Sequence, residues 1–127
     1  RAGAALQPRE LAKQVLAHRG DILLHKRALD VFTNRNVPTL LGALKPQAVV
    51  IYGVATDFCD RYTVEGLLRH LPGASLFLVT DAVRAIYPEE GERLIADWRD
   101  RGVRLISTRQ IVEDDLLDVV KEASGVI

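Results

Sequence analysis

Hydrophobic positions along the chain alternate between short continuous runs and stretches with helical spacing. The short runs are rich in leucine and β-branched residues and are typical of buried parallel strands. They predict strands at residues 22–24, 48–52, 76–79 and 103–106. Between these runs, apolar side chains recur every three or four residues, as on one face of a helix. This spacing predicts helices at residues 8–19, 38–44, 58–71, 88–101 and 110–123, and residues 32–36 are expected to form a loop.

Strands that alternate with helices through the whole length predict an α/β fold with a mainly parallel sheet. A chain of 127 residues suits one domain of ordinary size. In such sheets, ligands bind beyond the carboxyl ends of the strands. Lys26, the turn around Cys59 and Asp81 each follow a predicted strand, so we expect all three at that edge.

The segment AVVIYGVATDFCDR, residues 48–61, holds the most informative turn in the chain. Gly53 ends the apolar run, and Thr56 and Asp57 are both able to cap a following helix. Cys59 is therefore predicted to lie in the first turn of that helix. Unpaired amides and the helix dipole stabilise a thiolate or a developing oxyanion there. The arrangement is like a nucleophile elbow, although the Gly-x-Ser-x-Gly pattern of the hydrolases is missing.

Each candidate residue also has a simpler interpretation. A lone cysteine is usually a small buried hydrophobe, a single lysine such as Lys26 is usually a surface charge, and Asp81 is better explained as a cap of the next turn. Lys26 would favour ionisation of the Cys59 thiol only where the fold brings it close, whereas the neighbouring Asp57 and Asp60 would oppose ionisation. The three histidines lack metal-ligand spacing, and the chain has no glycine-rich phosphate loop.

Composition narrows the range of partners. Lys plus Arg and Asp plus Glu both count 17, and this zero formal charge argues against nucleic acid or an anionic membrane as a partner. A single cysteine cannot form an internal disulfide, and neither a secretory signal nor a membrane-spanning run is found in the sequence, so we expect a cytoplasmic location. The chain has no methionine, and we expect it to be the later part of a longer polypeptide.

A family resemblance rests on the motif VVIYGVATDFCD, with HKRALDVFTN upstream and LFLVTDA downstream. These stretches closely resemble the cysteine hydrolases of the isochorismatase-like superfamily, and within it the nicotinamidases most. The similarity runs from about Ile22 to Arg109. It implies a three-layer α/β/α, Rossmann-like fold with sheet order 3-2-1-4-5-6. Residues 1–127 would then be the C-terminal part of a single domain that lacks its first strands in this chain.

The resemblance also implies roles for individual residues. The family's catalytic centre consists of an aspartate, a lysine and a cysteine, and the match gives Lys26 as the lysine and Cys59 as the nucleophile. A cis peptide would join Val54 to Ala55 and aim the backbone amides of Ala55 and Cys59 into an oxyanion hole. Phe58 would contact the pyridine ring of the substrate.

Two parts of the family pattern are missing from these residues. The catalytic aspartate and the metal ligands of nicotinamidases belong to an N-terminal portion of the family fold. We therefore expect no metal site within this chain. A divalent metal such as zinc is expected only where that N-terminal portion supplies the ligands. Without the first strands, the strands at 22–24 and 48–52 would each have an exposed edge. We therefore expect a missing N-terminal segment, or a separate chain, to complete the sheet, and we also expect a homo-oligomer.

The predicted function is hydrolysis of a small amide through a thioester on Cys59, with nicotinamide giving nicotinic acid and ammonia. The first alternative is a related hydrolase of another small amide or of a ureido or carbamoyl compound. The second is a fragment or pseudoenzyme without catalytic activity that serves assembly. In that case Cys59 would simply be buried.

Overall fold

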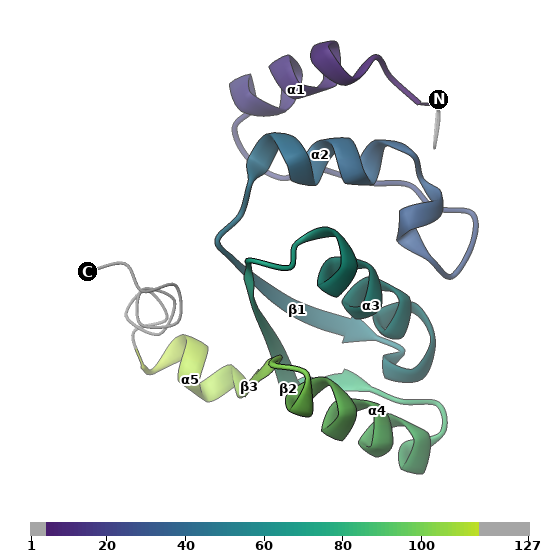
Figure 1. Ribbon diagram of the computed structural model, residues 1–127. Coiled ribbons are helices and arrows are strands. Elements are labelled where there is room, and N and C mark those ends of the chain that lie inside the picture. Colours follow the sequence, from purple (N-terminus) through teal and green to yellow (C-terminus); the bar gives the residue numbers. More distant parts are fainter. Residues whose placement is uncertain (1–4, 115–127) are drawn as a thin grey trace.

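The computed structural model describes residues 5–114 of the protein (Figure 1). Its strands are β1 (Ala48–Val54), β2 (Ser75–Arg84) and β3 (Arg104–Ile106). Its α-helices are α1 (Pro8–Ala17), α2 (Asn36–Leu44), α3 (Arg61–His70), α4 (Pro88–Asp100) and α5 (Thr108–Val112). Two short turns complete it: the 3₁₀ turn η1 (Val31–Thr33) and the π-helical turn η2 (Thr56–Asp60).

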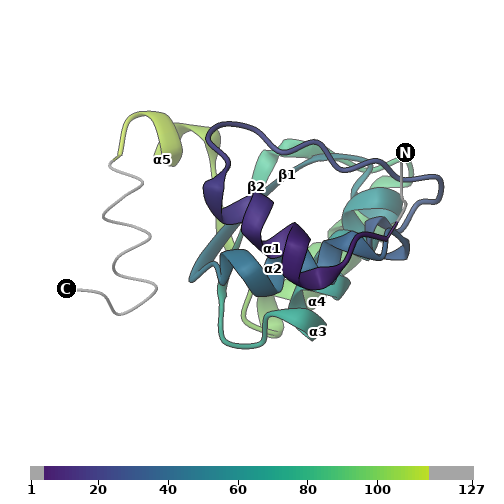
Figure 2. The same ribbon diagram turned by 90° about the horizontal axis from the view of Figure 1, so that it is seen from above.

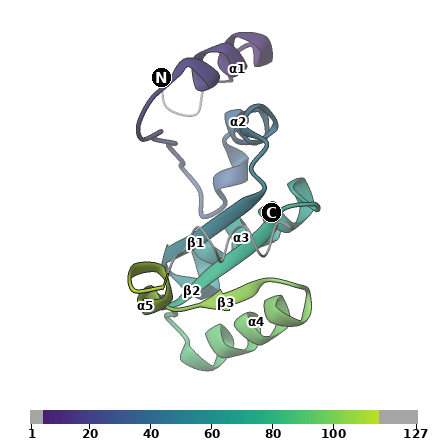
Figure 3. The same cartoon turned by 90° about the vertical axis from the view of Figure 1, so that its left-hand side faces the viewer.

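The three strands form one parallel sheet in the order β1-β2-β3, and they lie side by side in Figure 3. Ala48 pairs with Ser75, and Phe77 pairs with Arg104. The chain crosses between neighbouring strands through α3 and then through α4. This topology confirms the predicted α/β fold with a parallel sheet.

The core follows from the alternation of side chains along β2. Leu76 and Leu78 pack against α3 and α4, in a cluster that includes the fully buried Trp98. Phe77 and Val79 point to the opposite face, where α5 lies. The sheet therefore carries helices on both faces, and the layers can be followed in Figures 1 and 3.

Residues in the first turns of α4 and α5 explain where these two helices begin. Pro88 stands in the first turn of α4, followed by two acids that suit the positive end of the helix dipole. Ser107 and Gln110 form a capping box, which starts α5 two residues earlier than predicted. The described helix ends at Val112, and most of the predicted 110–123 helix lies outside the described residues.

The predicted strand at 22–24 is wrong. Residues 21–26 are extended but unpaired, and the Leu23 side chain is 81% exposed. An apolar run becomes a strand only where another strand offers hydrogen bonds, and no described strand lies along this one. Figure 2 shows the segment after α1 running along the molecule towards η1.

Several boundaries also differ from the prediction, and three of them bear on the site. Part of the expected loop at 32–36 belongs to η1, because Asp30 caps that turn by accepting a 2.9 Å hydrogen bond from the Phe32 amide. Helix α2 begins at residue 36 rather than 38. Strand β2 continues to residue 84, but its pairing with β1 is interrupted between Leu78 and Val83.

A close contact fixes η1 against α3. A Cβ atom on Gly66 would stand 2.1 Å from the Phe32 ring, so only glycine leaves room for that ring. The Phe32 ring also stacks on His70 with centroids 4.9 Å apart. This packing holds the chain that follows Lys26 beside α3. None of the helices in the described residues has the length and apolar content needed to cross a membrane.

Candidate active site

Cys59 lies in the turn that connects β1 to α3. Near the end of β1, Gly53 has a φ of +127°, which favours glycine, and the register of β1 shifts between Ile51 and Gly53. The amides of Phe58 and Asp60 both donate to the carbonyl of Ala55, at 3.1 and 3.0 Å, and close the turn. Sequence patterns predicted Cys59 in the first turn of a helix. It lies instead in η2, which leads directly into α3.

Lys26 reaches Cys59 from the extended segment before η1. Its Nζ lies 3.1 Å from Cys59 Sγ and also donates to the carbonyls of Leu29 at 3.2 Å and Ala28 at 3.4 Å. These carbonyls hold the ammonium group next to the sulfur. A cation at this distance favours the thiolate over the thiol. The fold thus brings together two residues that are 33 positions apart in the sequence.

A cavity of about 390 Å³ opens beside this pair. The C-terminal part of β1 and η2 form one wall, and apolar side chains of α2 and η1 form much of the other. Polar atoms come from five side chains that line it: Lys26, Tyr52, Cys59, Asp60 and Thr63. A nucleophile and a cation at the border of a mainly apolar cavity are a common arrangement in small-molecule sites.

Asp60 is a member of this site that the sequence indicated only as a negative charge next to Cys59. Its side chain is almost fully buried, with 6% exposed, and its Oδ2 atom has no hydrogen-bond partner among the described residues. Burial raises the pKa of the Asp60 carboxyl, and the positive charge of Lys26 acts in the opposite direction. The sequence signalled only that an acid follows the cysteine.

Asp57 has a different environment in the same turn. Its two carboxylate oxygens accept hydrogen bonds from the amides of Ile86 and Tyr87, each 2.9 Å long. Burial alone would raise the pKa of Asp57, but these amides outweigh it and the pKa lies below its usual value. Asp57 therefore ties the loop before α4 to η2.

We expect Asp57→Asn to destabilise the fold, because an amide offers one acceptor where the carboxylate offers two charged ones. A carboxylate whose pKa falls on folding stabilises the protein fully above its unfolded pKa of about 4, and this stabilisation is lost as the pH falls towards the lower folded pKa. Urea unfolding at several pH values measures the free energy of unfolding. The difference in this free energy between the variant and the parent should be largest near neutral pH. An equal difference at all pH values would contradict the role of the charge.

The backbone and aromatic parts of the predicted site are arranged as follows. The peptide bond between Val54 and Ala55 is cis, at the position that the family resemblance indicates. Phe58 does not line the cavity beside Cys59, and its ring lies 6.3 Å from that of Tyr87. The oxyanion-hole role of the Ala55 and Cys59 amides and the substrate contact of Phe58 both stay predictions.

Asp81 lies within β2 and does not cap the turn that follows a strand, so the prediction from its sequence context is wrong; it binds the start of α5 instead. It accepts hydrogen bonds from the Thr108 amide at 2.8 Å and from the Thr108 hydroxyl at 2.9 Å, and these bonds keep the pKa of Asp81 below its usual value. Among the described residues, no group of three or more His, Cys, Asp or Glu side chains is placed to hold a metal ion.

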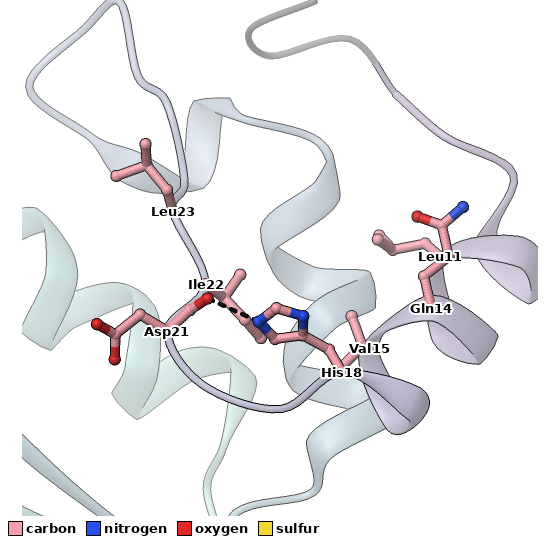
Figure 4. A pocket seen from close by; sticks show the side chains of 7 residues that line it. All are labelled: Leu11, Gln14, Val15, His18, Asp21, Ile22 and Leu23. Atoms are coloured by element: carbon pink, nitrogen blue, oxygen red, sulfur yellow. Dashed lines mark hydrogen bonds between the residues drawn. The ribbon is translucent and has the colours of Figure 1, made fainter.

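A second pocket lies away from Cys59, between the end of α1 and residues 21–23 (Figure 4). Its volume is about 250 Å³, and apolar side chains such as Leu11 and Ile22 supply most of its lining. The His18 ring there is 2.8 Å from the Asp21 carbonyl oxygen. No cysteine, serine, threonine or lysine lines this pocket.

Comparison with known families matches the family described as the isochorismatase domain to residues 6–115. Among solved structures, a pyrazinamidase of Pyrococcus horikoshii in complex with zinc is 32% identical, with a TM-score of 0.57. The similarity covers 67% of this chain and 46% of that one. Comparison with curated proteins gives no match.

Two further structures support the fold alone. An isochorismatase family protein from Desulfovibrio vulgaris is 24% identical, with a TM-score of 0.64 over 80% of this chain and 51% of that one. An isochorismatase-like hydrolase from Alkaliphilus metalliredigens is 19% identical, with a TM-score of 0.61 over 76% of this chain and 53% of that one. The chain spans about half the length of these relatives.

Proposed function

The chain belongs to the isochorismatase domain family, and on that premise we propose that it carries the nucleophile and the lysine of a cysteine-dependent hydrolase of small amides. The observation that carries this proposal is the 3.1 Å contact between Lys26 Nζ and Cys59 Sγ beside a cavity. The simpler interpretation of Lys26 as an isolated surface charge does not account for this contact.

In the proposed mechanism, the Cys59 thiolate attacks the carbonyl carbon of the amide. The amides of Ala55 and Cys59 hold the resulting oxyanion, and Lys26 stabilises both the thiolate and the negative intermediate. The nitrogen gains the proton that Cys59 lost, the C–N bond breaks and ammonia leaves. Water then hydrolyses the thioester to the acid and the free thiol. We assign the proton transfer to the family aspartate, which lies outside the described residues.

Nicotinamide is the substrate that we propose first, with nicotinic acid and ammonia as products. The support is the likeness of this chain to a pyrazinamidase and a cavity of about 390 Å³, within the range of small-molecule sites. Another small amide, or a ureido or carbamoyl compound, is the alternative within the same chemistry. Both require the nucleophile at Cys59.

We propose further that another segment or chain completes the sheet along the free edge of β1. In the described residues β1 pairs only with β2, and the side chains of Tyr52 and Val54 are 71% and 68% exposed. An open edge with apolar side chains favours pairing with another strand. A homo-oligomer and a zinc site built with outside ligands are further proposals of this kind.

A panel of amides tests the proposed function. The complete protein is incubated with nicotinamide, pyrazinamide, an aliphatic amide and a ureido compound, and the rate of ammonia release is measured for each. We expect nicotinamide to be the fastest. A faster ureido compound would favour the alternative substrate class. No ammonia from any of them, together with a Cys59 thiol that alkylates no faster than free cysteine, would contradict the enzyme and favour a role in assembly.

A further inference from the structure

We propose that Asp60 and Cys59 share the single positive charge of Lys26, so that the charge of Asp60 controls how readily the Cys59 thiol ionises. Asp60 would then be a positioning residue that tunes the nucleophile without touching the substrate. The inference rests on the proposed function, because it takes Cys59 as the nucleophile.

The three side chains line one cavity and come from two segments. Asp60 directly follows Cys59 in η2, and Lys26 faces both from the extended segment. The hydrogen bonds of Lys26 go to Cys59 Sγ and to two backbone carbonyls, so its charge reaches Asp60 without a direct hydrogen bond. The sulfur has the closer position to the cation.

Titratable groups on the elements that contact η2 include Tyr52 on β1, Arg61 and Glu65 on α3, and Glu90 on α4; Asp57 lies in η2 and Asp30 precedes η1. Glu65 pairs with Arg101. Asp30 caps η1, Asp57 is bound to backbone amides, and Glu90 pairs with Arg93. Tyr52 and Arg61 are exposed. In the described part of the chain, Lys26 is therefore the charged group that acts on Asp60.

The ionised forms of Cys59 and Asp60 compete for stabilisation by the single positive charge of Lys26. When Asp60 is ionised, its charge partly cancels that of Lys26, and the Cys59 thiolate becomes more costly. When Asp60 keeps its proton, Lys26 is available to the thiolate alone. Because Oδ2 of Asp60 is buried without a partner, the ionised form of Asp60 depends on the charge of Lys26 for its stabilisation. The two acids then titrate as a coupled pair.

The pH dependence of Cys59 alkylation tests this proposal. The complete protein is treated with iodoacetamide between about pH 4 and 9, and mass spectrometry follows the peptide that contains Cys59. Asp60→Asn removes the competing charge, so the midpoint of the alkylation profile should fall by about one pH unit. Well below the midpoint, the alkylation rate should rise about tenfold.

Asp57→Asn is the matched control, because it removes another buried carboxylate from the same turn. Its midpoint should stay at the parent value, since Asp57 is neutralised by amides and not by Lys26. If Asp60→Asn does not fold, Asp60→Leu removes the charge with a side chain of similar shape and should give the same fall. Circular dichroism checks the fold of every variant.

A second arm tests whether the effect passes through Lys26. In a Lys26→Met background, buried Asp60 keeps its proton, and Asp60→Asn should shift the midpoint much less than in the parent. An unchanged midpoint in the Asp60 variants, an equal fall in Asp57→Asn, or an undiminished shift in the Lys26→Met background would each overturn the proposal. Ammonia release by the parent and by Cys59→Ala tests the nucleophile separately, so the two failures are distinguishable.

Discussion

Replacing Cys59 by alanine abolishes ammonia release from the amide substrate, with an expected loss of about 10⁴-fold or more. Alanine has no atom that can attack the carbonyl carbon, so no thioester forms. The remaining groups, Lys26 and the backbone amides of the turn, still surround the substrate. Substrate binding should therefore be retained, and the loss should appear in kcat rather than in KM.

The control for this variant is the stability of the fold. Cys59 is only half-buried, and the described hydrogen bond of its sulfur is the one from Lys26, so Cys59→Ala should unfold close to the parent temperature. Cys59→Ser gives a second comparison, because a hydroxyl keeps the shape but is a far weaker nucleophile at neutral pH. Substantial turnover by a folded Cys59→Ala protein would rule out the cysteine mechanism.

Lys26→Met should lower turnover by about 10²- to 10³-fold, the usual cost of removing one group that stabilises charge in the transition state. Methionine keeps the apolar stem of the side chain and removes the cation 3.1 Å from Cys59 Sγ. Loss of the cation also removes the positive neighbour of the Cys59 sulfur. Alkylation at neutral pH should therefore slow as well.

Lys13→Met is the matched control for that experiment. Lys13 is exposed on α1 and lies outside the cavity that contains Cys59, so this variant makes the same chemical change at a distance. It should leave both turnover and alkylation at parent values. A Lys26→Met protein that behaves like Lys13→Met would show that the observed contact has no role in catalysis.

Patterns in the sequence were sufficient where the structure is local. The apolar runs of β1 and β2 and the proline that begins α4 each predicted the element that forms. The run at 22–24 has the same apolar character as β1 but no neighbouring strand, so it stays extended. Strand formation depends on a partner that composition does not reveal.

The candidate site also combines local features, which the sequence predicts, with contacts between distant residues, which it does not. The position of Cys59 after a strand and a turn was readable from the sequence, whereas its contact with Lys26 depends on the path of the whole segment from α1 to η1. Only the family resemblance paired these two residues in advance. The unpartnered oxygen of Asp60 had no signal in the sequence, because burial of a side chain and the absence of a donor arise from packing.

The central claim is that Cys59 is the nucleophile. Identifying the residue that carries the acyl group during turnover tests it most directly. The complete protein is mixed with nicotinamide, the reaction is stopped with acid during turnover, and the mass of the Cys59 peptide is measured. The same reaction is run with hydroxylamine, which captures a thioester as a hydroxamate. We expect a nicotinoyl group on Cys59 and a hydroxamate product, both missing in Cys59→Ala. Full turnover with unmodified Cys59 and no hydroxamate would contradict the proposed mechanism.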